Sequence, residues 1–391
     1  MAQILIPYPS PPFPFFPFPL PIILPNPAAN MKPKLYNALG LMSGTSIDGI
    51  DAALIETDGH GHVRRLGFTS SPYSAPFREK LRRHLGNPRG TADPEIAAFE
   101  RELTELHAEI SLHLLHEFGK TADLIGFHGQ TLYHHPEKRL TIQIGDGALL
   151  AKLTGIDVVN DFRSADVLAG GHGAPLVPLY HRALVTDLPK PVLILNIGGV
   201  SNVTWISGES DDEILAFDVG PGNALIDDWV LRHTGKPYDH NGQLADEGSV
   251  DAAAVDEALA MEFFHTLPPK SLDRDEFRKH VPENLNAADG AATLTMITAR
   301  AVAASLPFLP VKPSKVYVAG GGRHNATLMR WIAELSGLEV HSVDDLGWSG
   351  DGLEAEAFGW LAVRSLLDLP LSLPKTTGVP HPMCGGRLYK A

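Results

Sequence analysis

The 391-residue sequence predicts an α/β protein with two comparable lobes that face each other across a cleft. Strand-like runs alternate with helical stretches, the pattern typical of α/β architectures. Paired runs that resemble hairpins, and long helices, occur in both halves of the chain. The Pro/Gly-rich stretch 170–178 is the expected hinge between an N-terminal lobe at 34–168 and a C-terminal lobe at 169–391. The last helix can pack back on the N-terminal lobe.

The first 33 residues differ in composition from the rest of the chain. Ten of the 32 prolines fall between Pro7 and Pro27. Proline at this density removes backbone donors, so the segment is expected to be extended or disordered. It lacks the basic start of a signal peptide, and its prolines would break a membrane-spanning helix. We expect Met31 to be the physiological start, with a genuine flexible extension as the alternative.

From residue 34 onward, apolar runs bounded by Gly, Pro and polar residues predict strands. The expected strands are 35–41, 50–56, 124–128, 140–144, 192–197, 203–206, 214–218 and 315–319. The clearest helix is expected from Pro94 to Phe118, because Asp93 can cap it and apolar residues recur at helical spacing. Further helices are expected at 223–233, 292–306, 326–335 and 353–369.

Charge and cysteine content exclude several classes of protein. The chain has 32 Lys and Arg against 46 Asp and Glu, a formal net charge of −14. Without a basic block, such a chain is not expected to bind nucleic acid or an anionic membrane through its net charge. The single cysteine, Cys384, excludes an internal disulfide and a Cys-rich metal site, which agrees with a reducing cytoplasm.

Three glycine-rich segments, 42–51, 196–202 and 318–325, each follow an expected strand. The first two are predicted to be hairpin turns and the third a strand-to-helix turn. Successive N–H groups in such turns form anion-binding nests, and a helix N-terminus can accept phosphates. One such segment alone is more often only a turn, but three together predict a nucleotide site.

The first segment carries both glycines and carboxylates. Gly44 and Gly49 are expected to adopt positive φ and let the backbone approach a ligand closely. Asp48 and Asp51 suit a phosphate site only beside a divalent cation, and Mg²⁺ takes carboxylates directly or through water. Asp48 is the candidate for a water-mediated contact with the metal. Which of the two carboxylates lies nearer the metal stays open.

The common nucleotide-binding motifs are absent. Gly119-Lys120-Thr121 lacks the earlier glycine of a Walker A loop, and 171–173 lacks the third glycine of a dinucleotide fingerprint. A bound nucleotide is therefore expected between hairpins rather than in a Walker or Rossmann site.

Eight ordered blocks resemble the anhydro-N-acetylmuramic acid kinase family, within the superfamily of sugar kinases, actin and heat-shock chaperones. The blocks are GLMSGTSIDGIDAALIETDG (40–59), FHGQT (127–131), QIGDGALLA (143–151), TGIDVVNDFR (154–163), GGHGAPLVPLYH (170–181), LNIGGVSNVT (195–204), FDVGPGNALIDDW (217–229) and AGGGRHNATLM (319–329). They span nearly the whole chain from residue 35 onward. The resemblance implies a two-lobed actin-like, hexokinase-like ATPase fold with ribonuclease H-like lobes and a central nucleotide and sugar cleft.

The resemblance also implies an activity. Such an enzyme serves cell-wall recycling and amino-sugar degradation in the bacterial cytoplasm. It takes 1,6-anhydro-N-acetylmuramic acid, ATP and water, with Mg²⁺, and yields N-acetylmuramic acid 6-phosphate and ADP. Water opens the anhydro bridge at C1 while O6 accepts the γ-phosphoryl group. A homodimer is implied as well, whereas no nucleic-acid or membrane partner is expected.

The matching blocks carry the expected site residues. Asp218 matches the catalytic aspartate of the family, where a base for the attacking water is worth about 10²–10⁴-fold in rate. Capping of the helix after Gly222 is its alternative role. The expected nucleotide-binding residues are Gly44, Thr45, Ser46, Ile47, Asp48, Gly49, Ile50, Asp51, Asn196, Gly198, Gly199, Ser201, Asn202, Gly320, Gly321, Gly322 and Asn325. The expected substrate-binding residues are His128, Thr131, Arg163 and Glu354, with structural roles as the alternative.

Two positions depart from the family pattern. Ser164 and Ala165 follow Arg163 where further arginines are frequent, and His172 stands where Gln is common. These departures leave open which residues hold the lactyl carboxylate. Two other functions stay open at this point: a kinase of the same superfamily that acts on another amino sugar, and a non-enzymatic ATP-driven chaperone or filament module.

Overall fold

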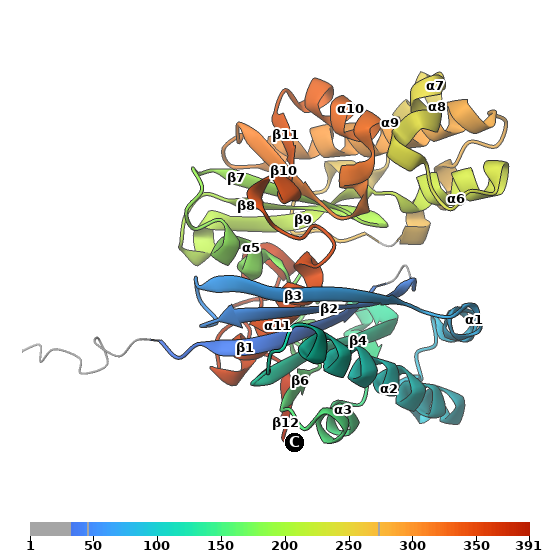
Figure 1. Cartoon of the computed structure of the whole chain (residues 1–391). Helices are drawn as coiled ribbons and strands as arrows, with labels where there is room; N and C mark the ends of the chain where they lie inside the picture. Colours follow the sequence, from blue (N-terminus) through green and yellow to red (C-terminus); the bar gives the residue numbers. More distant parts are fainter. Residues whose placement is uncertain (1–32, 45–46, 273) are drawn as a thin grey trace, which may run out of the picture. The chain divides into compact units, whose positions relative to one another are not determined.

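The computed structural model describes residues 33–44, 47–272 and 274–391. The chain divides into a segment up to Lys34 and a compact unit from Leu35 to Ala391. The expectations for residues 1–30, including the start at Met31, lie outside the described residues. The compact unit is an α/β structure built on two mixed sheets (Figure 1), which confirms the predicted fold class.

The first sheet begins with an antiparallel meander and continues with parallel strands. Its strands are β1 (Tyr36–Ser43), β2 (Gly49–Thr57), β3 (Val63–Pro72), β4 (Leu124–His135), β5 (Leu140–Ile144), β6 (Val158–Asn160) and β12 (Arg387–Tyr389). The order is β12-β6-β4-β1-β2-β3, and β5 pairs with β4. β4 runs parallel to β1, and β6 runs parallel to β4.

The second sheet repeats this connectivity. Its strands are β7 (Val192–Ile197), β8 (Val200–Ile206), β9 (Ile214–Pro221), β10 (Lys315–Ala319) and β11 (Glu339–Ser342). The order is β11-β10-β7-β8-β9, with β10 parallel to both β7 and β11. Each sheet thus has its first strand between an antiparallel hairpin partner and a later parallel strand. This shared arrangement is the ribonuclease H-like topology that the resemblance implies for both lobes.

Helices connect and cover the strands. They are α1 (Ala75–His84), α2 (Pro94–Glu117), α3 (Gly147–Thr154), α4 (Ser164–Leu168), α5 (Pro178–Leu184), α6 (Ala224–Thr234), α7 (Gln243–Glu247), α8 (Ala252–Leu259), α9 (Ala287–Ser305), α10 (Ala326–Ser336), α11 (Leu353–Leu366) and α12 (Pro374–Thr377). The prediction for α2 is confirmed at its start, and the helix ends one residue before the predicted Phe118, which is its C-cap. Asp93 caps it by accepting a hydrogen bond from the Glu95 N–H. Its apolar positions, such as Phe99 and Leu103, are fully buried.

Strand predictions were accurate for the largely buried strands β7 and β10 and for the half-buried strand β5. The bounds of β5, β7 and β10 coincide with the predicted ranges. β3 was not predicted, because its sequence VRRLGFTSSP is polar and lies at a sheet edge, where no residue is fully buried. The short strands β6, β11 and β12 also escaped prediction. α9 begins at Ala287 rather than 292, because Asn286 caps it.

α11 follows the second sheet in the chain but packs on the first. It contacts β1, β2 and β4. A Cβ atom on Gly40 would lie 1.7 Å from the Ala355 carbonyl oxygen, and one on Gly126 would lie 2.0 Å from the Phe358 carbonyl oxygen. Glycine at these two strand positions therefore lets the backbone of α11 approach the sheet. This close packing fixes the helix whose first turn carries Glu354.

One helix is apolar and long enough to cross a membrane by length and composition. It comprises α9 and the turn after it, Ala287–Phe308, among the described residues. Of its most apolar window, 61% is buried inside the protein. α9 packs against α6, α7, α8, α10 and β9, so its composition is that of a core helix.

Candidate active site

A cavity of about 530 Å³ is lined by residues from both sheets. Its wall includes the hairpins β1–β2 and β7–β8, the end of β10 and the start of α11. The predicted site residues that line it are Asp48, Asp51, Arg163, Asn196, Gly198, Asn202, Asp218, Gly320, Gly321 and Glu354. Segments far apart in the sequence therefore meet at one place.

The other predicted site residues lie off the cavity wall or outside the described part. Thr45 and Ser46 are outside the described residues. Those described away from the wall are Gly44, Ile47, Gly49, Ile50, Gly199, Ser201, Gly322, Asn325, His128 and Thr131. Several of them support residues that do line the cavity.

The turn between β1 and β2 differs from the prediction in one respect. The Ile47 N–H donates to the Gly44 carbonyl oxygen at 3.1 Å, and Ile47 itself has a φ of 53°. Gly49, expected at positive φ, does not adopt it. A Cβ atom there would lie 2.4 Å from the Ser71 carbonyl oxygen, so the glycine permits close pairing of β2 with β3. The prediction for Gly49 was wrong because strand packing, not the turn, requires the glycine.

Carboxylates gather on this side of the cavity. Burial raises the pKa of Asp51 to about 6, although a hydrogen bond from Ser70 opposes the rise. The negative charges of Asp48, Glu354 and Asp351 raise this pKa further. Bringing a cation to the site would relieve this repulsion.

The donor set fits a magnesium ion that also binds phosphate oxygens. Within residues 33–44, 47–272 and 274–391, no group of three or more His, Cys, Asp and Glu side chains could hold a metal by itself. Mg²⁺ is usually held by one or two carboxylates, waters and substrate phosphates. Asp48 and Asp51 on the cavity wall meet this requirement.

The turn between β7 and β8 is neutral and is fastened to the start of α6. The carbonyl oxygens of Gly198 and Gly199 accept hydrogen bonds from the backbone N–H groups of Asn223 (2.7 Å) and Gly222 (3.0 Å). A Cβ atom on Gly222 would lie 2.3 Å from the Gly198 oxygen. The Asn223 side chain adds a hydrogen bond from Nδ2 to the Ile197 carbonyl oxygen at 3.0 Å. The Gly198 N–H is also engaged, because it donates to the Val200 carbonyl oxygen at 3.2 Å.

The third glycine segment rests on this second hairpin. Gly320 has a φ of 74°, and a Cβ atom there would lie 2.6 Å from both Asn196 Oδ1 and the Ile197 carbonyl oxygen. A Cβ atom on Gly322 would lie 2.5 Å from the Ile197 side chain. Asn325 caps α10 through its side-chain oxygen. Gly322 and Asn325 thus have structural roles, while Gly320 faces the cavity.

Asp218 lies on β9, at the cavity wall. Its Oδ2 accepts a hydrogen bond from the Leu272 N–H at 2.8 Å, and its N–H donates to the Lys270 carbonyl oxygen at 3.0 Å. Burial raises the pKa of Asp218 to about 7, although the Leu272 hydrogen bond and the Lys270 charge oppose the rise. Asn223 occupies the N-cap position of α6, so the alternative capping role of Asp218 is excluded.

Lys270 was missed by the sequence analysis. Its side chain is buried, and its Nζ donates to the Phe263 carbonyl oxygen at 2.8 Å. The Nζ also lies 4.5 Å from the ring centroids of both Phe263 and Phe308. Burial lowers the pKa of Lys270 to about 8, against the effect of the Asp218 charge. The only signal in the sequence is a lysine directly after two prolines in an apolar stretch.

His181 was also missed, although it lies in a quoted block. It is buried on α5, lines the cavity, and its Nδ1 lies 2.9 Å from the Thr204 hydroxyl. Burial lowers the pKa of His181 to about 3, so the ring is neutral. It can therefore form hydrogen bonds with a ligand without bringing a charge.

Arg163 reaches the cavity with the support of His128. Its Nε donates to His128 Nε2 at 3.1 Å, and Nη1 donates to the Gly173 carbonyl oxygen at 2.5 Å. Burial, with the adjacent Arg163 charge, lowers the pKa of His128 well below its usual value. His128 Nδ1 lies 2.8 Å from the Gly129 carbonyl oxygen, which assigns it the proton. The hydroxyl of Thr131, which does not line the cavity, accepts a hydrogen bond from Gln143 Nε2 of β5 at 3.2 Å.

Glu354, on the first turn of α11, lies on the cavity wall and interacts with both Arg163 and Asn196. Asn196 Nδ2 donates to Glu354 Oε1 at 3.4 Å. Burial raises the pKa of Glu354, while the Arg163 charge and the Asn196 hydrogen bond oppose the rise. Glu354 therefore faces a cation on one side and the second hairpin on the other.

Two ribonuclease H-like sheets with a shared cavity, three glycine turns and carboxylates are the features expected of a two-lobed ATP-using kinase. The model of the family described as anhydro-N-acetylmuramic acid kinase matches residues 36–391. The chain belongs to this family, which confirms the resemblance of the eight blocks.

Relatives with this name are similar over almost their whole length. The anhydro-N-acetylmuramic acid kinase of Rhizorhabdus wittichii is 52% identical over 361 residues, which are 90% of this chain and 98% of the relative. That of Rhodospirillum rubrum is 50% identical over 354 residues, 90% of this chain and 94% of the relative. A solved ROK hexokinase from Thermus thermophilus is 17% identical with a TM-score of 0.36, covering 85% of this chain and 99% of that one, a likeness too weak to carry an argument.

Proposed function

We propose that the chain is an ATP-dependent kinase that opens 1,6-anhydro-N-acetylmuramic acid with water and phosphorylates its O6. The products are N-acetylmuramic acid 6-phosphate and ADP. Membership of the family establishes a kinase and excludes a non-enzymatic module. The observation that carries the detailed proposal is Asp218, which shares one cavity with residues of both hairpins.

The reaction couples two bond changes at the anhydro bridge. Asp218 takes a proton from water, the water oxygen bonds to C1, and the C1–O6 bond breaks. O6 then bonds to the γ-phosphorus, and the bond from that phosphorus to the bridging oxygen of ADP breaks. A base with a pKa of about 7 suits this role near neutral pH, because it is ionised yet still basic. The Leu272 N–H holds Oδ2, so Oδ1 is left for the water.

Other side chains orient the sugar. The lactyl carboxylate needs a cation, and Arg163 on the cavity wall supplies one. Its orientation depends on His128, which accepts its Nε–H. Glu354 and neutral His181 can accept or donate hydrogen bonds with hydroxyl and acetamido groups of the sugar. Positioning of this kind contributes much of the rate in a reaction between three bound partners.

The glycine turns receive the nucleotide. The first and second hairpins flank the phosphates, and Gly320 and Gly321 lie beside the adenosine. Asp48 and Asp51 would hold Mg²⁺ directly or through water, and the bound ion neutralises charge on the phosphates. Burial and repulsion already raise the pKa of Asp51, which supports a site that needs a cation. We further propose a cytoplasmic homodimer without nucleic-acid or membrane partners.

A product assay in ¹⁸O-labelled water tests the proposal. Incubation with ATP, Mg²⁺ and the anhydro sugar should give a sugar that carries ¹⁸O at C1 and phosphate on O6. The ¹⁸O atom at C1 together with the phosphate on O6 establishes that ring opening accompanies phosphoryl transfer. Phosphorylation of another amino sugar alone, or an unlabelled C1, would contradict the proposal.

A further inference from the structure

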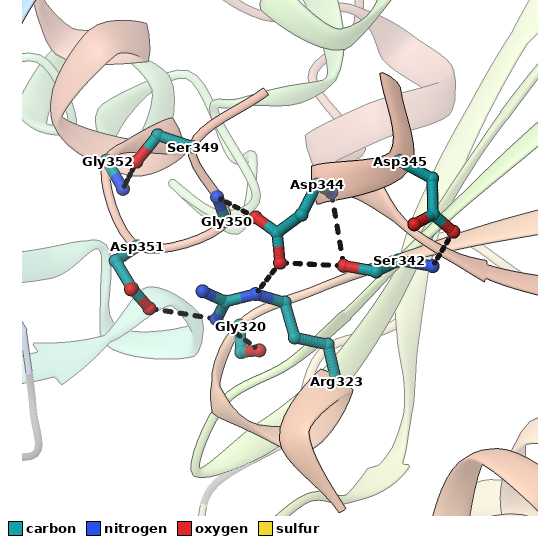
Figure 2. Close-up of polar contacts among 9 residues, drawn as sticks. All are labelled: Gly320, Arg323, Ser342, Asp344, Asp345, Ser349, Gly350, Asp351 and Gly352. Atoms are coloured by element: carbon teal, nitrogen blue, oxygen red, sulfur yellow. Dashed lines mark hydrogen bonds and ion pairs between the residues drawn. The ribbon is translucent and has the colours of Figure 1, made fainter. Parts of the chain in front are cut away.

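The side chain of Arg323 joins two segments that line the cavity (Figure 2). Arg323 lies on the short 3-10 helix Gly321–His324 that follows β10. Its Nε donates to Asp344 Oδ2 at 2.8 Å. Its Nη1 donates to Asp351 Oδ1 at 2.8 Å and to the Gly320 carbonyl oxygen at 3.0 Å. Only 4% of this side chain is exposed.

The partners of Arg323 are themselves held in place. Asp344 Oδ1 accepts a hydrogen bond from the Gly350 N–H at 3.1 Å, and its Oδ2 accepts one from the Ser342 hydroxyl at 2.8 Å. A Cβ atom on Gly350 would lie 2.2 Å from Arg323 Nε, so the guanidinium lies against the Gly350 backbone. The segment 342–352 therefore wraps closely around the guanidinium, as Figure 2 shows.

These contacts reach the cavity from two directions. Gly320 lies on the proposed adenosine side of the cavity wall, while Gly350 and Asp351 lie on the wall next to α11. The Asp351 charge also raises the pKa of Asp51 on the first sheet. Arg323 itself does not line the cavity. Any effect of Arg323 on a ligand must therefore pass through its partners.

We propose that Arg323 is a positioning residue that holds the Gly320–Gly321 turn and Asp351 in the arrangement that binds the nucleotide. This inference rests on the proposed function, which places ATP beside that turn. A guanidinium can bind two carboxylates and a carbonyl at once through its planar donors, and charge-assisted bonds of this kind are the strong ones. Removal of the cation leaves Asp344 and Asp351 without a shared partner and frees the turn to move.

The expected defect is confined to the nucleotide. α11 is anchored independently, by its close packing on Gly40 and Gly126 of the first sheet. Glu354 on α11, and Arg163 on the other wall, therefore keep their places when Arg323 is changed. The Gly320 carbonyl oxygen accepts hydrogen bonds from the backbone N–H of Arg323 at 3.3 Å and from its side chain, and it is the side chain that joins the turn to segment 342–352. A positioning role thus predicts a change in nucleotide affinity without an equal change for the sugar.

The test compares Arg323→Met and Arg323→Lys with the control Arg330→Met. Arg330 lies on α10 and pairs with Asp246 at the surface, at 2.6 Å. We expect Arg323→Met to raise the KM for ATP and the Kd for ADP by about tenfold, equal to the loss of about 1.4 kcal/mol of binding. The KM for the anhydro sugar should change by less than about twofold, because α11 stays in place. Arg323→Lys can pair with one carboxylate at a time, so its effect should be about threefold.

Two results would overturn the inference. One is a folded Arg323→Met variant whose Kd for ADP equals that of the unchanged protein. The other is an equal rise in the KM of both substrates, which a general structural loss would cause. If Arg323→Met does not fold, Arg323→Lys and Asp351→Asn decide by the same readouts. Failure of the unchanged protein to bind ADP would instead count against the proposed function.

Discussion

The two hairpins that begin the two sheets differ in charge and in how they are held. The β1–β2 turn carries Asp48 and Asp51, and its start is held by side chains, since Ser43 donates to Gln130 at 2.6 Å. The β7–β8 segment 196–202 carries no ionisable side chain. It is held by the backbone N–H groups of Gly222 and Asn223, just before α6, and by the Asn223 side chain. The same topology therefore gives one hairpin with carboxylates, where the proposed function needs a metal ion, and one neutral hairpin, where it needs contacts with phosphate oxygens.

The second sheet supplies one carboxylate to the cavity, Asp218 on β9, and its replacement should have the largest effect. Asp218→Asn keeps the shape and the hydrogen bond to the Leu272 N–H but cannot take a proton. We expect kcat to fall by about 10²–10⁴-fold, the usual worth of a general base. The Kd for ADP should stay within about twofold. Rapid-quench kinetics and calorimetry measure both, and near-normal turnover would remove Asp218 from the role.

Position 320 should not tolerate a side chain, because the third glycine segment packs there against the second hairpin. Gly320→Ala places a Cβ atom 2.6 Å from Asn196 Oδ1 at a φ of 74°. Strain and overpacking together should cost about 3 kcal/mol of unfolding free energy. Gly235→Ala is the matched control, because Gly235 also has a φ of 74° but no atom within 4 Å of its Cβ position. Urea unfolding should show a clearly smaller loss for the control; equal losses would contradict the packing argument.

The carboxylates of the first hairpin should control the metal requirement. Asp51→Asn removes one charge from the expected Mg²⁺ site, and the Mg²⁺ concentration at half-maximal activity should rise by about tenfold. Asn202→Ala in the second hairpin should change that concentration by less than about twofold, because no carboxylate is lost. Activity measured across a magnesium series compares the two variants. An equal rise of the half-maximal Mg²⁺ concentration in both variants would contradict a metal site formed by the first hairpin alone.

The smallest expected effect concerns the pH profile. Asp218 acts as a base when ionised, and its pKa is about 7, so kcat/KM should fall as pH falls through 7. The positive charge of Lys270 lowers the pKa of Asp218. Lys270→Met should therefore move the acidic limb of the profile to higher pH. Lys315→Met, which removes an exposed lysine paired with Glu339, is the control. An acidic limb that moves to lower pH or stays unchanged would contradict this assignment.

The sequence predicted those parts of the fold that depend on local, apolar patterns. The strands at 192–197 and 315–319 are buried runs, and the capped helix at Asp93 follows local rules. β3 escaped because its residues are polar and its place is set by pairing with β2. The same pairing explains why Gly49 does not adopt a positive φ.

The candidate site was predictable where its residues lie in turns that resemble a known family. Gly198 and Gly320 come from such turns, Asp218 comes from the strand that precedes one, and all three line the cavity. Lys270 and His181 were missed, because their importance arises only from contacts made across the folded chain. The role of His128 behind Arg163 likewise depends on a contact that no local pattern indicates.

A crystal structure with the anhydro sugar and a non-hydrolysable ATP analogue tests the central claim most directly. The account predicts the triphosphate between the two hairpins and a water within about 2.6–3.2 Å of Asp218 Oδ1, in line with C1 of the sugar. A nucleotide bound away from both hairpins, or an Asp218 carboxylate that faces no water near C1, would contradict it.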